Sequence, residues 1–257
     1  MIRKRILFRL KPRYKKTLPV FIMGCGRSGT TMMLDIFHSD MRIETLGEND
    51  SKIAGNNYML KYEKLTPAIY NSRAAVMVMK PILNSFDAKK ILMNYEKAVI
   101  IWLLRDYKDM VASSMKKFGN RVALSIKDLI VKNTGGNWIS TGIHSETKQI
   151  LQELDYSAIS DLDWMALVWW SVNRTIIIDN LTNQRGFTLL RYENFVDNQY
   201  TLLNKIYDSI GLRNELSSSN FVHTKSIGKG SDIELNPIVD RMCSNLKEEL
   251  AALAIKS

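Results

Sequence analysis

Short apolar runs alternate with amphipathic stretches along most of the chain. The runs lie at Val20–Met23, Ala75–Met79, Ala98–Leu104 and Phe187–Leu190. The third run is continuously apolar, which is typical of a strand buried on both faces of a parallel sheet. A stretch with helical spacing follows the first run, with apolar positions at Met32, Met33, Ile36 and Phe37. Strands that alternate with helices predict a single-domain α/β fold with a mostly parallel, doubly wound sheet.

Helix-start and helix-stop residues define the other predicted helices. These run from a cap at Asn84 or Ser85 to about Tyr95, over Lys108–Phe118, Leu162–Leu181 and Thr201–Ile210, and onward from Asn236-Pro237. Ser160 is the predicted cap of the long third helix, and Gly211 ends the fourth as a glycine after a helix does. The helical spacing of three tryptophans in the long helix makes them predicted core residues: Trp164, Trp169 and Trp170.

Two stretches lack a regular pattern. Residues 39–62 are polar and predicted to be irregular. Residues 119–160 carry two short helical patterns, around Ala123–Val131 and Glu146–Leu154, with a glycine-containing loop between them. Long irregular insertions in compact domains are often functional, so we expect residues 119–160 to form a lid over an acceptor site. Trp138, in the glycine-containing loop, is an acceptor-site candidate.

Charge is unevenly distributed along the chain. The net charge is +10, and most of it lies in the first 16 residues, which contain no acidic residue. We expect a basic segment at residues 1–18 and one domain at residues 19–257. The segment could contact an anionic membrane surface or a polyanionic acceptor, or it could be a solvated terminus. The nearly neutral remainder argues against a broad nucleic-acid-binding face.

Neither membrane insertion nor a cysteine-based site is indicated. No apolar run approaches the roughly 20 residues that a membrane helix needs. The only cysteines, Cys25 and Cys243, lack the spacing of a metal site or a disulfide framework. Few cysteines fit a reducing compartment, so we expect a cytoplasmic protein, with peripheral membrane contact through the basic segment as the alternative.

A glycine-rich turn follows the first strand, in the sequence Gly24-Cys25-Gly26-Arg27-Ser28-Gly29-Thr30-Thr31. Such a turn points backbone N–H groups and a helix N-terminus at one place, which suits phosphate or sulfate. In the P-loop pattern G-x-x-x-x-G-K-[ST], Thr30 occupies the lysine position, and the positive charge lies at Arg27 instead. The alternative is a purely structural turn capped by Ser28 or Thr30, which would not need an arginine with three hydroxyl groups.

Polar or cationic residues also end the later strands, at Lys80, Arg105 and Arg191-Tyr192. Ligands of doubly wound sheets bind beyond the carboxyl ends of the strands, so these residues predict an anionic ligand there. Ser113 follows Arg105 by two helical turns and could add a hydroxyl donor to its guanidinium fork. The alternative is that Arg105 pairs with Asp106 or Asp109 where the helix begins.

The motifs GCGRSGTT, Lys80-Pro81, LLRDYKDMVASS and RYENFVDN, taken in order, resemble the sulfotransferases that use 3′-phosphoadenosine 5′-phosphosulfate (PAPS). The likeness covers Val20 to about Leu212 and is nearer to the bacterial and protein-tyrosine branch than to the cytosolic small-phenol enzymes. It implies a sulfotransferase, P-loop-like fold and transfer of a sulfuryl group to a hydroxyl acceptor, without a metal. The acceptors that remain open are a glycan, a lipid-linked glycan, a peptide tyrosine or a small alcohol.

The resemblance also implies roles for individual residues. The residues expected to hold the 5′-phosphate are Gly26, Arg27, Ser28, Gly29, Thr30 and Thr31. Arg105 and Ser113 are implied at the 3′-phosphate, Tyr192 at the nucleotide, and Lys225 or Lys229-Gly230 in a late loop that closes over it. The product nucleotide would be adenosine 3′,5′-bisphosphate.

For catalysis, the resemblance implies Glu48 as general base, with Glu44 and Asp50 as alternatives. Arg27 and Lys80 suit the negative charge that grows on the leaving group. The histidines are isolated and are not expected to be catalytic: His38, His144 and His223.

Two other functions remain open. The first is a P-loop nucleotide or sugar kinase, in which the strand ending at Asp106 would carry a metal-binding acid. The second is a nucleotide-binding protein of the same fold that catalyses nothing.

Overall fold

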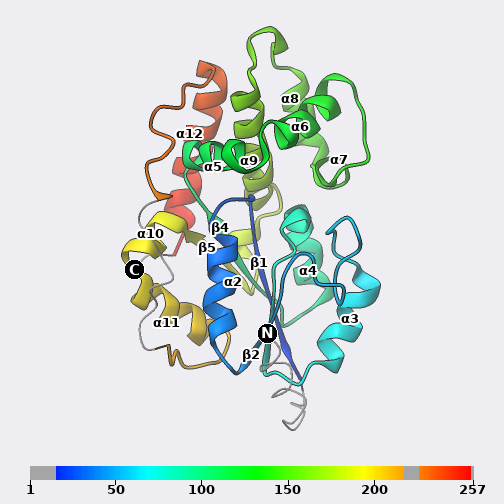
Figure 1. The fold of residues 1–257 in the computed structure, drawn as a ribbon, viewed down its shortest axis with the longest axis vertical. Helices are drawn as coiled ribbons and strands as arrows, with labels where there is room; N and C mark the ends of the chain where they lie inside the picture. Colours follow the sequence, from blue (N-terminus) through cyan, green and yellow to red (C-terminus); the bar gives the residue numbers. More distant parts are fainter. Residues whose placement is uncertain (1–15, 217–225, 256–257) are drawn as a thin grey trace.

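The computed structural model describes residues 16–216 and 226–255 (Figure 1). The expectations for most of the basic segment, for His223 and for Lys225 concern residues outside this part of the chain. Within the described part, no helix combines the length and the apolar content that crossing a bilayer would require.

Five parallel strands form one sheet in the order β2-β3-β1-β4-β5. Their bounds are β1 Leu18–Gly24, β2 Ile43–Leu46, β3 Val76–Met79, β4 Val99–Leu104 and β5 Phe187–Arg191. The predicted α/β class and parallel sheet are confirmed. The prediction that residues 39–62 are irregular is wrong at β2, an edge strand of four residues with two half-buried positions. So short a strand leaves too little alternation to be recognised.

Helices cover both faces of the sheet, as expected for a doubly wound fold. Successive residues of β1 point to opposite faces: Val20 and Ile22 pack in one core, and Phe21 and Met23 in the other. The first core is covered by α2 (Thr30–Ser39) and α11 (Gln199–Ser209). The second includes side chains of α3 (Tyr62–Asn71), α4 (Ala88–Asn94), α5 (Tyr107–Phe118), α6 (Arg121–Val131), α9 (Asp161–Ile178) and α12 (Pro237–Leu253).

The long helix α9 is the centre of the second core and packs on α5, α6 and α12 (Figure 1). Ser160 caps it as predicted, in a capping box with Asp163. The three tryptophans of α9 are buried, which confirms the prediction for Trp164, Trp169 and Trp170. The indole N–H of Trp169 donates to the carbonyl oxygen of Arg105 at 2.8 Å, so α9 fixes the end of β4.

Residues 119–160 are mostly helical, so the expectation of an irregular insertion is wrong, whereas the helical patterns predicted around Ala123–Val131 and Glu146–Leu154 are confirmed. The segment holds α6, α7 (Trp138–Gly142), α8 (Ser145–Gln152) and a 3₁₀ turn at Tyr156–Ala158. Asn137 forms a capping box with Ser140, so Trp138 begins a helix and does not lie in a glycine loop. Its ring lies 5.8 Å from that of Phe86, between centroids. The lid function of this segment stays a prediction.

Two other helix boundaries differ from the expectation. Asn84 and Ser85 do not cap a helix, because they lie inside a 3₁₀ helix at Ile82–Asp87. Asn84 instead accepts the backbone N–H of Leu60 at 2.7 Å. A short helix, α10 (Tyr192–Asp197), begins directly after β5. The caps of the last predicted helix are confirmed, with Asn236 capping α12.

Candidate functional site

The turn between β1 and α2 is fixed by its neighbours. Gly24 has a φ of 127°, and a Cβ there would lie 2.4 Å from the carbonyl oxygen of Leu103 in β4. The Ser85 hydroxyl donates to the Gly24 carbonyl at 2.8 Å and accepts its N–H at 3.1 Å. At the other end, Gly29 has a φ of 91°, and a Cβ would lie 2.5 Å from the Tyr192 ring. Both ends of the turn therefore require glycine.

The N-terminus of α2 is open to an anion. Gly29 is its N-cap residue, and no side chain in the described part of the chain caps the helix. The first N–H groups of a helix have no partner within the helix and carry its positive dipole end. The Ser28 hydroxyl is buried, and none of the described residues bonds with it. By contrast, a Cβ on Gly26 would meet open space, so no contact in the structure explains that glycine.

A cavity of about 800 Å³ lies beside this turn, within the range of nucleotide-sized pockets. Its lining joins residues from the β1–α2 turn, α2, the end of β4, α5, α10 and a loop at Ser226–Gly230, called here the late loop: Arg27, Gly29, Thr30, Thr31, Met32, Arg105, Asp109, Ala112, Ser113, Lys116, Lys117, Tyr192, Ser226 and Lys229. Five of these side chains are cationic and one is a carboxylate, so the cavity suits an anion.

Lys116 and Lys117 were not predicted to belong to the site. They lie three and four residues after Ser113 on α5, which is the spacing that places side chains on the same face of a helix. This periodicity, applied to Ser113, could have identified both lysines in the sequence.

Arg27 joins the turn to two other elements. Its φ of 68° is in the left-handed region, which is uncommon for a residue other than glycine. Its side-chain Nε donates to the Ser113 hydroxyl at 3.1 Å, and its carbonyl oxygen accepts Nη1 of Arg105 at 3.0 Å. The hydroxyl predicted to accompany Arg105 is thus bonded to Arg27.

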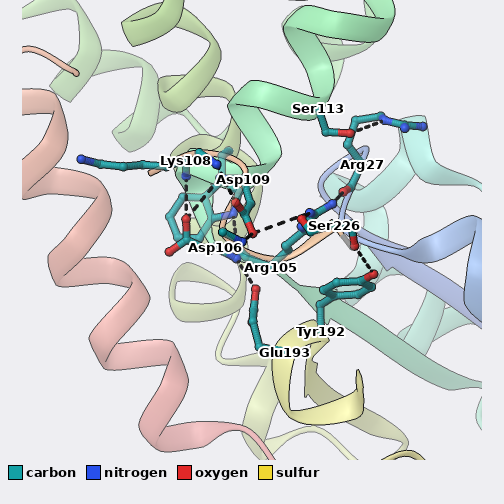
Figure 2. Close-up of polar contacts among 12 residues, drawn as sticks. Arg27, Arg105, Asp106, Lys108, Asp109, Ser113, Tyr192, Glu193 and Ser226 are labelled. Atoms are coloured by element: carbon teal, nitrogen blue, oxygen red, sulfur yellow. Dashed lines mark hydrogen bonds and ion pairs between the residues drawn. The ribbon is translucent and has the colours of Figure 1, made fainter. Parts of the chain in front are cut away.

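Figure 2 shows the side chain of Arg105 between the turn and the late loop, bonded to the carbonyl oxygens of Arg27 and Ser226. Its guanidinium also lies 3.6 Å from the Asp109 carboxylate and 4.8 Å from the Tyr192 ring centroid. Arg105 is 5% exposed, and its Nε has no partner among the described residues. The helix-entry pair with Asp109 is therefore present, alongside the contacts that place Arg105 at the cavity.

Asp106 has a structural role that weakens the kinase alternative. Its carboxylate accepts the backbone N–H groups of Lys108 and Asp109 as the N-cap of α5, and it forms an ion pair with Lys247 at 3.0 Å. Because both oxygens of the Asp106 carboxylate already have partners in the protein, this residue is poorly placed to bind a metal ion. The described residues contain no group of three or more histidine, cysteine, aspartate or glutamate side chains that could hold a metal ion.

The start of α10 is bonded to both the late loop and the N-cap residue of α5 (Figure 2). The Tyr192 hydroxyl bonds with that of Ser226 at 2.7 Å. The next residue, Glu193, accepts the backbone N–H of Asp106 at 2.8 Å. Burial raises the pKa of Glu193, and that hydrogen bond lowers it by a smaller amount.

Lys80 and Glu48 form an ion pair, and neither lines the cavity, but Lys80 is bonded to Thr31, which does. The ammonium nitrogen of Lys80 lies 3.1 Å from Glu48 Oε2 and donates to the Thr31 hydroxyl at 3.1 Å. Lys80 is 7% exposed, whereas the Glu48 side chain is 38% exposed. The alternative base Glu44 is bonded to Lys52 and Ser72, both at 2.7 Å.

The remaining candidates lie elsewhere or are unreactive. His144 pairs with Asp179 at 3.5 Å, His38 bonds with Thr45 at 2.7 Å, and neither lines the cavity. Asp50 accepts the backbone N–H of Lys52. Burial raises the pKa of the Cys25 thiol to about 12, so it is not a thiolate near neutral pH.

Sequence comparison identifies no family, because neither protein-family models nor curated proteins match the chain. Solved structures do match. The sulfotransferase domain from the Synechococcus PCC 7002 olefin synthase has a TM-score of 0.51 and 13% identity, over 94% of this chain and 97% of that one. Sulfotransferase STF9 from Mycobacterium avium has a TM-score of 0.50 and 12% identity, over 99% and 81%. The protein has the fold of the sulfotransferases.

Proposed function

We propose that the protein transfers a sulfuryl group from PAPS to a hydroxyl acceptor. The observation that carries this proposal is the cationic cavity at the glycine turn, with the Lys80–Glu48 pair joined to the cavity wall through Thr31. The cavity supplies a place for an anionic donor, and the pair supplies a base and a cation for the transfer.

Residues in and beside the cavity fit such a donor at both of its anionic ends. The buried Ser28 hydroxyl and the open N-terminus of α2 suit the 5′-phosphosulfate, together with Thr30 and Thr31. For the 3′-phosphate we propose Arg105, Ser113 and Lys229, with Lys116 and Lys117 as additional cations. When bound, the donor supplies an activated sulfuryl group on a phosphate leaving group.

The catalytic roles follow from the same geometry. Glu48 takes the proton of the acceptor hydroxyl, whose oxygen then forms the new bond to sulfur as the bond from sulfur to the phosphate oxygen breaks. Lys80, held against Thr31, stabilises the negative charge that develops on that phosphate oxygen. Arg27 adds positive charge at the turn. For the acceptor we propose a glycan, a lipid-linked glycan or a small alcohol.

The test has a binding step and a transfer step. Adenosine 3′,5′-bisphosphate should raise the melting temperature of the protein more than ATP with Mg²⁺ does. PAPS labelled with radioactive sulfur should then transfer label to a hydroxyl compound in cell-extract fractions. Stabilisation by ATP with Mg²⁺ alone would favour the kinase instead, and nucleotide binding without transfer to any fraction would favour a protein that only binds nucleotides.

A further inference from the structure

The late loop at Ser226–Gly230 packs directly on the first turn of α5. A Cβ on Gly230 would lie 2.2 Å from the carbonyl carbon of Lys108 and 2.5 Å from the backbone nitrogen of Asp109. The backbone of the loop therefore packs directly against the backbone of α5. A residue larger than glycine at position 230 would require the backbone to move, because the nearest atoms belong to backbone rather than to a side chain that could give way.

Asp109 holds the loop by both oxygens of its carboxylate. Oδ1 accepts the N–H of Gly230 at 2.8 Å, and Oδ2 accepts the N–H of Gly228 at 2.9 Å. Asp109 is 3% exposed, so these bonds are shielded from water. The Arg105 guanidinium, 3.6 Å away, offsets the charge of the carboxylate, which would otherwise repel an anion in this cavity.

Lys229 lies between the two glycines that Asp109 holds, and it lines the cavity. The start of the loop is also fixed, because Ser226 bonds with Arg105 and Tyr192. The position of the Lys229 backbone is therefore set on both sides by a residue that is 120 positions away in the sequence. Asp109 need not touch the ligand to affect how the ligand binds.

We propose that Asp109 is a positioning residue that presents Lys229 to the second phosphate of the donor nucleotide, the 3′-phosphate. This inference rests on the function proposed above. A carboxylate suits the task, since both its oxygens accept hydrogen bonds, whereas an asparagine would turn an N–H₂ group toward one of the glycine N–H groups.

The test compares Asp109→Asn, Lys229→Ala and the double variant by calorimetric titration. The probes are adenosine 3′,5′-bisphosphate and adenosine 5′-monophosphate. Each single variant should weaken binding of the bisphosphate by about tenfold, as expected for losing a charged hydrogen bond, and leave the monophosphate nearly unchanged. The double variant should bind no worse than Lys229→Ala, because Asp109 acts through Lys229. The control is Asp240→Asn, which removes a carboxylate that contacts Tyr107 and Lys108 but not the loop.

Two further variants keep the test decisive if Asp109→Asn does not fold. Gly230→Ala displaces the loop without changing any charge, so it should reproduce the selective loss of the bisphosphate. Asp109→Glu keeps the carboxylate and should restore part of the affinity. In hydrogen exchange without nucleotide, Asp109→Asn and Gly230→Ala should each speed exchange in the peptide that contains Gly228–Gly230.

The outcomes separate this inference from the proposed function. If the wild type prefers the bisphosphate but the effects of Asp109→Asn and Lys229→Ala multiply, or Asp109→Asn weakens both nucleotides equally, the positioning role is overturned and the function stands. Unchanged exchange in the loop peptide would overturn it too. If the wild type does not prefer the bisphosphate, the proposed donor is wrong, and the positioning role fails with it.

Discussion

The ammonium group of Lys80 lies 3.1 Å from the carboxylate of Glu48, at the N-terminal end of α2. The two residues come from different segments, one at the end of β3 and one after β2, which are neighbouring parallel strands. Lys80 is mostly buried and also bonded to Thr31, so it is fixed against the glycine turn. Glu48 is more exposed and can meet a hydroxyl group that arrives from solvent.

This relationship predicts that Glu48→Gln greatly slows transfer and leaves nucleotide binding intact. A glutamine keeps the shape of the side chain but does not accept the hydroxyl proton. The expected loss in kcat is about 10²–10⁴-fold, the usual contribution of a positioned base. The measurements are the rate of label transfer from PAPS and the affinity for adenosine 3′,5′-bisphosphate.

Glu44→Gln is the matched control for this experiment. Glu44 lies in β2, four residues earlier, and both of its carboxylate oxygens are engaged by Lys52 and Ser72. Its replacement should leave kcat nearly unchanged. If Glu44→Gln removes activity and Glu48→Gln does not, the base has been assigned to the wrong carboxylate.

Arg105→Ala should distinguish the two phosphate ends of the donor. The guanidinium is buried at the cavity, and its loss should weaken adenosine 3′,5′-bisphosphate by about 10- to 100-fold, as for hydrogen bonds to a charged group. Binding of adenosine 5′-monophosphate should fall much less. Equal weakening of both nucleotides would mean that Arg105 only braces the turn and the late loop, through its bonds to Arg27 and Ser226.

The sequence predicts the parts of this molecule that local patterns determine. Continuous apolar runs identify the buried strands β1, β3 and β4, and the glycine turn identifies the end of the sheet at which the cationic cavity lies. The edge strand β2 is not recognised in the sequence, because only two of its four residues are buried and so short a stretch has no clear apolar pattern. Within residues 119–160 the apolar spacing indicates α6 and α8, whereas α7 escapes because it has only five residues and its cap, Asn137, follows two glycines.

Side-chain partners in the site depend on tertiary structure, which local patterns do not contain. Ser113 follows Arg105 by two helical turns, yet its hydroxyl accepts from Arg27, 86 residues away. In the sequence, Asp109 is only a possible partner of Arg105 in the first turn of a helix, yet its carboxylate accepts the N–H of Gly230, 121 residues away. In both pairs the sequence supplies the residue types, and the packing of α5 against the turn and the late loop selects the partner.

Gly29→Ala should destabilise the fold by about 1–3 kcal/mol, through a left-handed backbone conformation and overpacking against Tyr192. Gly26→Ala, in the same turn, should cost less than about 1 kcal/mol, because a Cβ there meets open space. Urea denaturation without nucleotide measures both. Similar losses in the two variants would contradict the packing of Tyr192 on Gly29.

The half-buried Glu193 should make stability depend on pH. Its pKa is raised by burial above the ordinary glutamate value of 4.5, so the folded protein binds this proton more tightly than the unfolded chain does. The resulting stabilisation is present below the ordinary pKa and is lost as the pH rises through the folded value.

The variant Glu193→Gln tests this dependence, because a glutamine does not titrate and its amide oxygen can still accept the N–H of Asp106. The free energy of unfolding of the variant, relative to wild type, should therefore increase as the pH rises from about 4 to about 7. Glu63→Gln, at an exposed position, is the control for the loss of one carboxylate. If the difference in unfolding free energy between Glu193→Gln and wild type stays constant with pH, burial does not raise the pKa of Glu193.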